Sequence, residues 1–208
     1  MKLHVFPPSP RAAKVTALAY HLDLASELQI VDLFKGEQFT PTFAALNPNK
    51  RMPVLEDDGF ILWESNAILQ YLASKKPERG LWPQTARGQA DVTRWMTWEA
   101  AHWTPACTLL VFERVVKKLA GQGEPDPAEV AKGEAEFPKW AAVLNQQLAG
   151  RKWLLGDTLT IADFSIGAPL IMAEAARLPL ADYPEIRRWY AQLAALPAWK
   201  KAAVAPPA

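Results

Sequence analysis

Two serine residues stand where helices are expected to begin, so each could bind a negatively charged group. Ser9 precedes Pro10, and proline favours the first position of a helix. Ser65 follows Glu64 at the start of a second apolar pattern with helical spacing. The free N–H groups of a helix start and the Ser65 hydroxyl can receive a carboxylate, while Glu64 offsets an ammonium group. Glu64 and Ser65 together are therefore suited to binding a zwitterion. The alternative is that both residues only favour the start of the helix.

A proline at the start of an expected strand indicates a second way to hold a ligand. An X-Pro bond lowers the cost of the cis form to about 0.5–1 kcal/mol. A cis Met52-Pro53 bond fits a strand that leaves the backbone of Met52 free, so that an extended ligand can bind as an added strand. The alternative is an ordinary trans proline at a strand edge.

The elements that must position these residues begin with a β-α-β unit. Residues 3–6 are short and apolar, and apolar residues recur at helical spacing from 15 to 22. Residues 28–33 then alternate as a half-buried strand does. The pattern predicts a strand, a loop, a helix and a second strand, with Ser9 just before the helix.

A hairpin and a further helix follow this unit. The apolar segments 53–56 and 60–62 flank an Asp-Asp-Gly turn at 57–59, the strongest short-range hairpin signal in the chain. An amphipathic helical pattern then begins near Glu64 and ends before Pro77. The second pair of strands is therefore expected to be antiparallel.

The remainder of the chain is expected to form an entirely helical domain. From about Gly88 onward every segment has helical periodicity and lacks a strand pattern. The sequence predicts an α/β domain over residues 1–78, a linker at 79–87 and a helical domain over 88–208. The last residues, 202–208, are expected to fray.

Several sequence motifs accompany these elements. They are Ala45-Leu46-Asn47-Pro48-Asn49-Lys50-Arg51-Met52-Pro53-Val54-Leu55, then Asp57-Asp58-Gly59, then Leu62-Trp63-Glu64-Ser65-Asn66-Ala67-Ile68, and finally Trp153-Leu154-Leu155-Gly156-Asp157-Thr158-Leu159-Thr160-Ile161-Ala162-Asp163. Together with the element order, they resemble the glutathione S-transferases. The resemblance implies an α+β fold class, in which a thioredoxin-like N-terminal α/β domain precedes a second, all-α helical-bundle domain.

The resemblance also implies that glutathione is a co-substrate and that no metal is needed. Met52 would hydrogen-bond the cysteinyl backbone of glutathione from the strand that Pro53 opens. Glu64 and Ser65 would hold the γ-glutamyl end. These roles follow from the family pattern at these positions.

The glycyl end of glutathione would meet polar side chains elsewhere in the first domain. Gln38, Lys50 and Arg51 are the donors available for the glycyl carboxylate. Gln38 stands where similar sequences often have histidine. Which of the three contacts the carboxylate stays open.

Ser9 falls where the serine-type, bacterial-like members of the family carry their activating hydroxyl. Glutathione must react as a thiolate, because the thiol is a poor nucleophile. Lowering a free thiol pKa of ~8.5 by ~2 units costs ~2.7 kcal/mol. One charge-assisted hydrogen bond supplies ~1.5–3 kcal/mol, and a helix N-terminus adds ~0.3–1 kcal/mol. One hydroxyl at the helix start is thus enough to lower the thiol pKa by this amount. The alternative is that Ser9 only caps its helix.

The first helix departs from the serine-type pattern. That pattern commonly has an arginine two residues before the valine that corresponds to Val15. Here Ala13 and Lys14 precede Val15, and Arg11 lies earlier. The role of Arg11 is open. The absence of a cysteine at the helix start disfavours thiol-disulfide exchange through an enzyme cysteine.

The helical domain holds one structural motif and two pocket candidates. Thr160 and Asp163 have the spacing of a capping box, which predicts a buried helix start rather than chemistry. Trp103 and Phe112 fall on the first long helices, the part of the family's fold that receives the electrophile. They are the candidates for its apolar pocket.

Composition excludes several classes of protein. Among 208 residues there are 23 Lys and Arg and 22 Asp and Glu, so the chain has no excess of positive charge to bind nucleic acid or anionic membranes. A single cysteine, Cys107, excludes an internal disulfide framework and suits a reducing compartment such as the cytoplasm. No apolar run of membrane-spanning length and no signal-peptide core is found.

The expected function is attack of the glutathione thiolate on a small hydrophobic electrophile. The family usually forms homodimers, and the resemblance implies one here. One alternative is a glutathione-dependent isomerase, dehalogenase or peroxidase, because the same thiolate begins these reactions. The other alternative is a binding module that has lost its chemistry.

Overall fold

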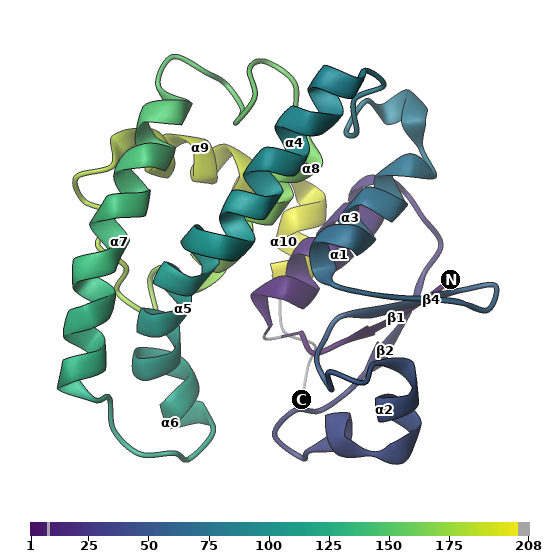
Figure 1. The fold of residues 1–208 in the computed structure, drawn as a ribbon, viewed down its shortest axis with the longest axis horizontal. Coiled ribbons are helices and arrows are strands. Elements are labelled where there is room, and N and C mark those ends of the chain that lie inside the picture. The colour runs from purple at the N-terminus through teal and green to yellow at the C-terminus, as the bar shows by residue number, and fades with distance from the viewer. Residues whose placement is uncertain (8, 204–208) are drawn as a thin grey trace. The chain divides into compact units, whose positions relative to one another are not determined.

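The structure is a computed structural model that describes residues 1–7 and 9–203. The chain divides into two compact units, and Figure 1 shows the chain coloured from its N-terminus onward. The first unit is Met1–Trp82 together with the segment that begins at Ala195, and the second is Pro83–Ala194.

The C-terminal segment groups differently from the sequence expectation. The sequence places everything after residue 88 in the helical domain, whereas the last helix groups with the first unit. The linker at 79–87 stays a prediction. Of the tail expected to fray, Ala202 and Ala203 are helical, and residues 204–208 lie outside the described residues.

A four-stranded sheet with the order β2-β1-β3-β4 organises the first unit. β1 (Lys2–Val5) pairs in parallel with β2 (Glu27–Ile30) and antiparallel with β3 (Val54–Asp57), and β4 (Phe60–Trp63) pairs antiparallel with β3. The β-α-β unit and the hairpin predicted from the sequence are confirmed. Because β1 and β2 are parallel, the loops that follow them leave the same edge of the sheet.

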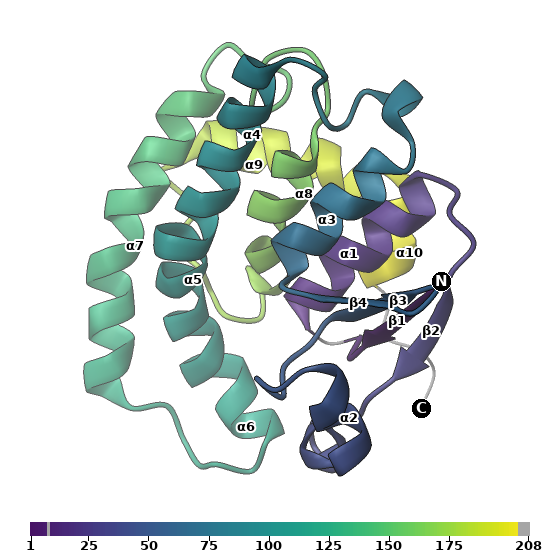
Figure 2. The same cartoon turned by 45° about the vertical axis from the view of Figure 1, so that its right-hand side comes forward.

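The central helix of the first unit is buried along most of its length. The helices are α1 (Pro10–His21), α2 (Pro41–Leu46), α3 (Ser65–Ser74) and α10 (Pro197–Ala203), with short 3-10 helices at η1 (Glu37–Phe39) and η2 (Pro77–Arg79). α1 packs against α3 and α10, and Figure 2 shows the three side by side. Residues 12–19 of α1 are all buried, so its polar members must find partners inside the unit.

The regular elements of the second unit are all helices, joined by turns and loops, and one isolated β-bridge links Trp153 and Gly156. Its helical segments are α4 (Ala86–Trp98), η3 (Glu99–Trp103), α5 (Thr104–Val111), η4 (Phe112–Val116), α6 (Lys117–Leu119), α7 (Pro127–Leu148), α8 (Ile161–Gly167), η5 (Ala168–Met172) and α9 (Pro184–Ala195). α4 to α6 form one continuous helical run with π-helical turns at η3 and η4. The predicted α+β fold class is confirmed.

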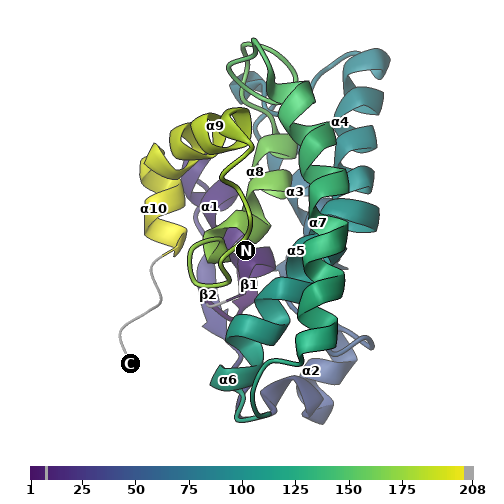
Figure 3. The same cartoon turned by 90° about the vertical axis from the view of Figure 1, so that its left-hand side faces the viewer.

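Close helix packing forms the core of the second unit. Figure 3 shows α5 and α7 lying side by side. A Cβ atom at Gly133 of α7 would lie 2.7 Å from the Leu110 side chain of α5, so glycine permits this approach. Phe137 of α7 is fully buried, and its ring centre lies 5.2 Å from that of Trp103.

α8 begins with the predicted capping box, which is confirmed. The Asp163 carboxylate accepts hydrogen bonds from the N–H groups of Thr160 at 2.9 Å and Leu154 at 2.8 Å. The Trp189 indole donates to it at 2.8 Å. Burial raises the pKa of Asp163, while these donors act in the opposite direction. The motif joins α8, α9 and the preceding loop.

Candidate functional site

Ser9 begins α1 without capping it. Its backbone is extended at φ −78° and ψ 122°, and its side-chain oxygen accepts no hydrogen bond from the described backbone of the helix. The Ser9 N–H donates to the Phe6 carbonyl at 2.8 Å, and the Ser9 carbonyl accepts from Ala13 at 2.9 Å. Pro10 supplies the first helical residue and lacks an N–H group. The hydroxyl is therefore held at a helix start while remaining available to a ligand.

α3 begins at a residue with an uncommon backbone conformation. Glu64 has φ 71° and ψ 110°, a region that residues other than glycine rarely adopt. Its carbonyl accepts from the Ile68 N–H at 3.0 Å, and Ser65 is buried as the first helical residue. The Glu64 carboxylate is exposed and does not cap the helix. Such strain persists where the surrounding structure imposes it, and binding sites are common places for it.

Asn47 organises the loop that leads into β3. Its side-chain Nδ2 donates to the Arg51 carbonyl at 2.7 Å, and its Oδ1 accepts from the backbone two residues onward at 3.0 Å. The Met52-Pro53 bond is cis, as predicted. Pairing between β1 and β3 begins at Val54, so the backbone of Met52 lies outside the sheet ladder.

The three donors expected for a carboxylate lie in the first unit. Gln38 is in η1, and its buried Oε1 has no hydrogen-bond partner among the described residues. An amide without a partner can turn its NH2 group toward a ligand. Lys50 is exposed, and its Nζ lies 5.8 Å from the ring centre of Phe39, which is next to Gln38 in the chain. Arg51 is exposed as well.

Family models match both halves of the chain. The model described as "Glutathione S-transferase, N-terminal domain" matches residues 1–74, and "Glutathione S-transferase, C-terminal domain" matches residues 127–192. The chain is 37% identical to "Glutathione S-transferase 3" of Zea mays over 213 residues, which cover 100% of this chain and 95% of that protein. The chain belongs to the glutathione S-transferase family. It is accordingly a transferase enzyme, as the sequence resemblance predicts.

Other glutathione S-transferases are similar over nearly the whole length. GstB of Escherichia coli (strain K12) is 30% identical over 200 residues, covering 95% of each chain. The theta class enzyme of Xanthomonas axonopodis pv. citri, solved with glutathione bound, has 27% identity and a TM-score of 0.90 over 99% of this chain and 97% of that one. A Burkholderia graminis glutathione transferase with two glutathione molecules per subunit has 29% identity and a TM-score of 0.85, with 99% and 88% covered.

The second unit of this glutathione S-transferase does not offer Trp103 to a ligand. Its side chain is 0% exposed, and its indole Nε1 donates to the Ile166 carbonyl at 3.0 Å. Trp103 is a core residue, so the expectation that it lines an electrophile pocket is corrected. Phe112 lies in η4 with 36% exposure and stays a candidate. A large aromatic residue at helical spacing suits either environment, which is why the sequence did not separate them.

An aromatic pair beside Ser9 was not anticipated from the sequence. Phe34 is 54% exposed, and its ring meets Phe6 edge to face with centres 5.2 Å apart. The Asp32 Oδ1 accepts from the Phe34 N–H at 2.9 Å and from the Lys35 N–H at 3.3 Å, so an ordered turn holds the exposed ring. The available signal was an apolar residue placed directly after the strand predicted at 28–33, at the sheet edge where the Ser9 loop also emerges.

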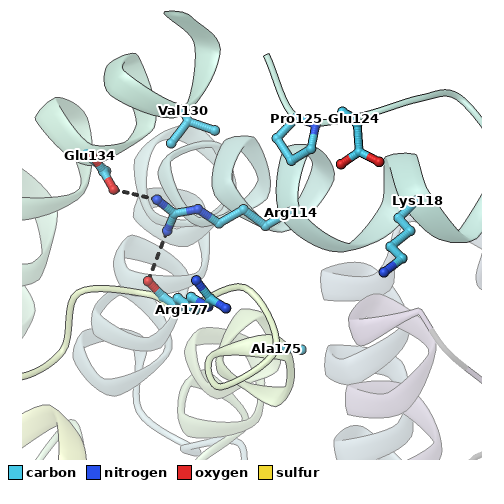
Figure 4. Close-up of a pocket in the computed structure, with 8 residues that line it drawn as sticks. All are labelled: Arg114, Lys118, Glu124, Pro125, Val130, Glu134, Ala175 and Arg177. Carbon is cyan, nitrogen blue, oxygen red and sulfur yellow. Dashed lines mark hydrogen bonds and ion pairs between the residues drawn. The ribbon is translucent and has the colours of Figure 1, made fainter. Parts of the chain in front are cut away.

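A separate pocket of about 660 Å³ lies within the second unit. It is lined by Arg114, Lys118, Glu124, Pro125, Val130, Glu134, Ala175 and Arg177. Figure 4 shows Arg114 lying between Glu134 and the backbone of Arg177. Its guanidinium pairs with Glu134 and donates to the carbonyls of Ala176 at 3.1 Å and Arg177 at 3.0 Å. This arginine therefore links η4, α7 and the segment after η5, and no predicted site residue lines the pocket.

Cys107 is a buried residue of α5 rather than a reactive thiol. Burial raises its pKa well above the usual value, and the nearby Glu99 carboxylate adds to this effect.

Over residues 1–7 and 9–203, no group of three or more His, Cys, Asp or Glu side chains could hold a metal ion. In the same part of the chain, no helix combines the length and apolar character needed to cross a membrane.

Proposed function

We propose that this enzyme conjugates the thiolate of glutathione to small hydrophobic electrophiles. The observation that carries the proposal is the Ser9 hydroxyl, which lies at the N-terminus of α1 and does not cap it. A hydroxyl in this position can donate a charge-assisted hydrogen bond to a thiolate. The N-terminus of α1 favours the same negative charge. Both effects lower the pKa of a thiol bound there.

Glutathione is the proposed co-substrate, and the glutathione-bound structures of the Xanthomonas and Burkholderia enzymes support this choice. In our proposal the N–H and C=O groups of Met52, just before Pro53, bind the cysteinyl backbone of the tripeptide. Their place outside the sheet ladder supports this role. Glu64 and Ser65 hold the γ-glutamyl group at the start of α3, where the first N–H groups receive its carboxylate.

We propose that the glycyl carboxylate is bound by the donors of η1 and of the loop before β3. The Gln38 amide, whose Oε1 has no partner among the described residues, and the exposed side chains of Lys50 and Arg51 support this assignment. Cations and an amide are the groups that a carboxylate accepts hydrogen bonds from. No metal takes part in the proposed chemistry.

The electrophile is proposed to be small and apolar because aromatic side chains stand close to Ser9. Phe6 is joined to Ser9 by a backbone hydrogen bond, and Phe34 presents its exposed ring beside Phe6. Phe112 of η4 is the further candidate from the helical unit. Aromatic faces of this kind bind flat apolar groups by stacking and by exclusion of water.

The proposed reaction has two parts. Ser9 donates its hydroxyl hydrogen bond to the glutathione sulfur, and the thiol proton passes to solvent. The thiolate electron pair then forms a carbon–sulfur bond, and a leaving group such as halide departs with its bonding pair. Ser9 keeps its own proton throughout.

The test is a pH titration of the ultraviolet absorbance of thiolate for glutathione bound to the enzyme, with S-methylglutathione as the blank. We expect the bound thiol to ionise ~2 units below the free thiol value of ~8.5. Binding with an unshifted thiol would contradict the proposal. Absence of binding would contradict the glutathione site itself.

We also propose that the enzyme is a cytoplasmic homodimer. The edge strand β4 exposes the side chains of Phe60, Ile61 and Trp63, which is an unusual surface for a chain that stays monomeric. A lone cysteine suits the reducing cytoplasm. Sedimentation analysis of the parent and of a Phe60→Lys variant tests the dimer, and the variant is expected to be monomeric.

A further inference from the structure

Lys14 is a buried lysine at the centre of the first unit. Its side chain is 1% exposed, which makes it the most buried lysine or arginine among the described residues. Its Nζ donates a hydrogen bond of 2.7 Å to Oδ1 of Asn66, 52 positions further along the chain. Burying an ammonium group is costly, and an apolar side chain of similar size is often as stable or more stable in such a place. The choice of lysine therefore calls for a reason other than packing.

One partner of Lys14 lies in the first turn of α3. Asn66 is the second residue of that helix and directly follows Glu64 and Ser65. Glu64 has φ 71°, and its conformation persists only if neighbouring contacts fix the start of α3. The Lys14–Asn66 hydrogen bond is a contact of this kind, because it ties the first turn of α3 to the middle of α1.

We infer that Lys14 is a positioning residue for the γ-glutamyl carboxylate of glutathione, an inference that rests on the proposed function. It acts through Asn66, which it holds so that the first N–H groups of α3 keep their direction toward the carboxylate. Its ammonium group also adds positive charge beneath a helix N-terminus that already favours an anion. In this inference Lys14 acts at the γ-glutamyl end of glutathione and not on the thiol, which the proposed function places at the start of α1.

The experiment compares two ligands that differ only in the γ-glutamyl group. S-methylglutathione carries it, and S-methyl-cysteinylglycine lacks it. Both are titrated calorimetrically into the parent enzyme and into a Lys14→Met variant. We expect the variant to bind S-methylglutathione about tenfold more weakly, since the charge near the helix N-terminus and the hydrogen bond to Asn66 are lost. Affinity for the dipeptide should change less than twofold.

Lys75→Met is the matched control. Lys75 also ties α3 to a neighbouring element, because it pairs with Asp57 of β3. It lies nine residues beyond Asn66, which is about 14 Å along the helix. The control should bind both ligands as the parent does. In steady-state assays Lys14→Met should raise KM for glutathione while kcat and the pKa of the bound thiol keep the parental values.

Two results would overturn the inference. One is a Lys14→Met enzyme that binds S-methylglutathione within twofold of the parent. The other is an equal loss of affinity for both ligands, which would mean a general structural role. If Lys14→Met does not fold, Asn66→Ala carries the same comparison with an expected selective loss of about threefold. A parent enzyme that binds neither ligand would instead overturn the proposed function.

Discussion

α1 begins at Ser9 in the first unit and α8 begins at Thr160 in the second, yet these two hydroxyl side chains are used differently. Thr160 is buried in a capping box, and the Asp163 carboxylate accepts from several surrounding donors. Ser9 is half-buried and makes no cap bond to the helix that it begins. A polar network that is fully satisfied belongs to the fold, whereas a hydroxyl left without a cap bond at a helix start is available for chemistry.

Asp163→Ala tests the structural member of this comparison and has the largest expected effect. The change leaves the buried N–H groups of Thr160, Leu154 and Trp189 without their acceptor. Each lost acceptor costs roughly 1 kcal/mol or more, so the free energy of unfolding should fall by about 3 kcal/mol. Urea denaturation measures this change. Asp163→Asn keeps one acceptor oxygen and should lose less, and a fully stable Asp163→Ala would refute the structural role.

Ser9→Ala tests the catalytic member. Loss of thiolate stabilisation of ~2.7 kcal/mol corresponds to a decrease in kcat/KM of about 100-fold. Because the bound thiol pKa should rise toward its free value of ~8.5, the decrease is largest at low pH and vanishes above that pKa. The free energy of unfolding should change by less than about 0.5 kcal/mol, since no cap bond is lost.

The pH profile of conjugation to an aromatic halide measures the Ser9 effect. Ser74→Ala is the control, because Ser74 is an exposed serine in the same unit whose hydroxyl donates to the Tyr71 carbonyl. It should keep the parental rate at every pH. A Ser9→Ala enzyme with parental kcat/KM at low pH would remove the distinction drawn between Ser9 and Thr160.

Thr85→Ala sharpens the comparison with an ordinary cap. Thr85 begins α4, and its hydroxyl oxygen accepts from the Gly88 N–H at 3.2 Å. Its loss should lower the free energy of unfolding by about 1 kcal/mol. Turnover at saturating glutathione should be unchanged, which is the reverse of the Ser9 pattern. Thermal unfolding and a standard conjugation assay measure both quantities, and a loss of turnover without loss of stability would contradict the cap assignment.

Asp57→Asn extends the comparison to buried carboxylates and has the smallest expected effect. Hydrogen bonds from Lys75 and from the Tyr71 hydroxyl hold the pKa of Asp57 below its usual value, whereas burial raises that of Asp163. A carboxyl whose pKa is lower in the folded state stabilises the fold above its unfolded pKa of ~3.9, and this contribution disappears as pH falls through the folded pKa.

Because Lys75 is partly exposed, the loss for Asp57→Asn at pH 7 should stay below about 1 kcal/mol. Thermal unfolding from neutral to acidic pH measures it. The difference between variant and parent should shrink as the pH falls below ~4. A stability difference between variant and parent that is constant with pH would show that the charge of Asp57 does not contribute to the free energy of unfolding.

Features that depend on a few consecutive residues were predictable from the sequence. The Asp-Asp-Gly turn predicted the hairpin between β3 and β4, and the Thr-x-x-Asp spacing predicted the capping box at Thr160. The cis bond at Met52-Pro53 was likewise predicted from a proline at a strand start. The positions of the glutathione-site residues in the chain followed from a contiguous motif, and their roles stay proposals.

The tertiary structure decided which side chains meet across long stretches of chain. It placed Trp103 in a core, grouped α10 with the first unit and brought Phe34 against Phe6. It also joined Lys14 to Asn66 across 52 positions. Local conformational preferences act between neighbours in sequence and can be recognised in short patterns. Burial and side-chain pairing depend on how whole elements pack, so they became visible only when the elements were placed together.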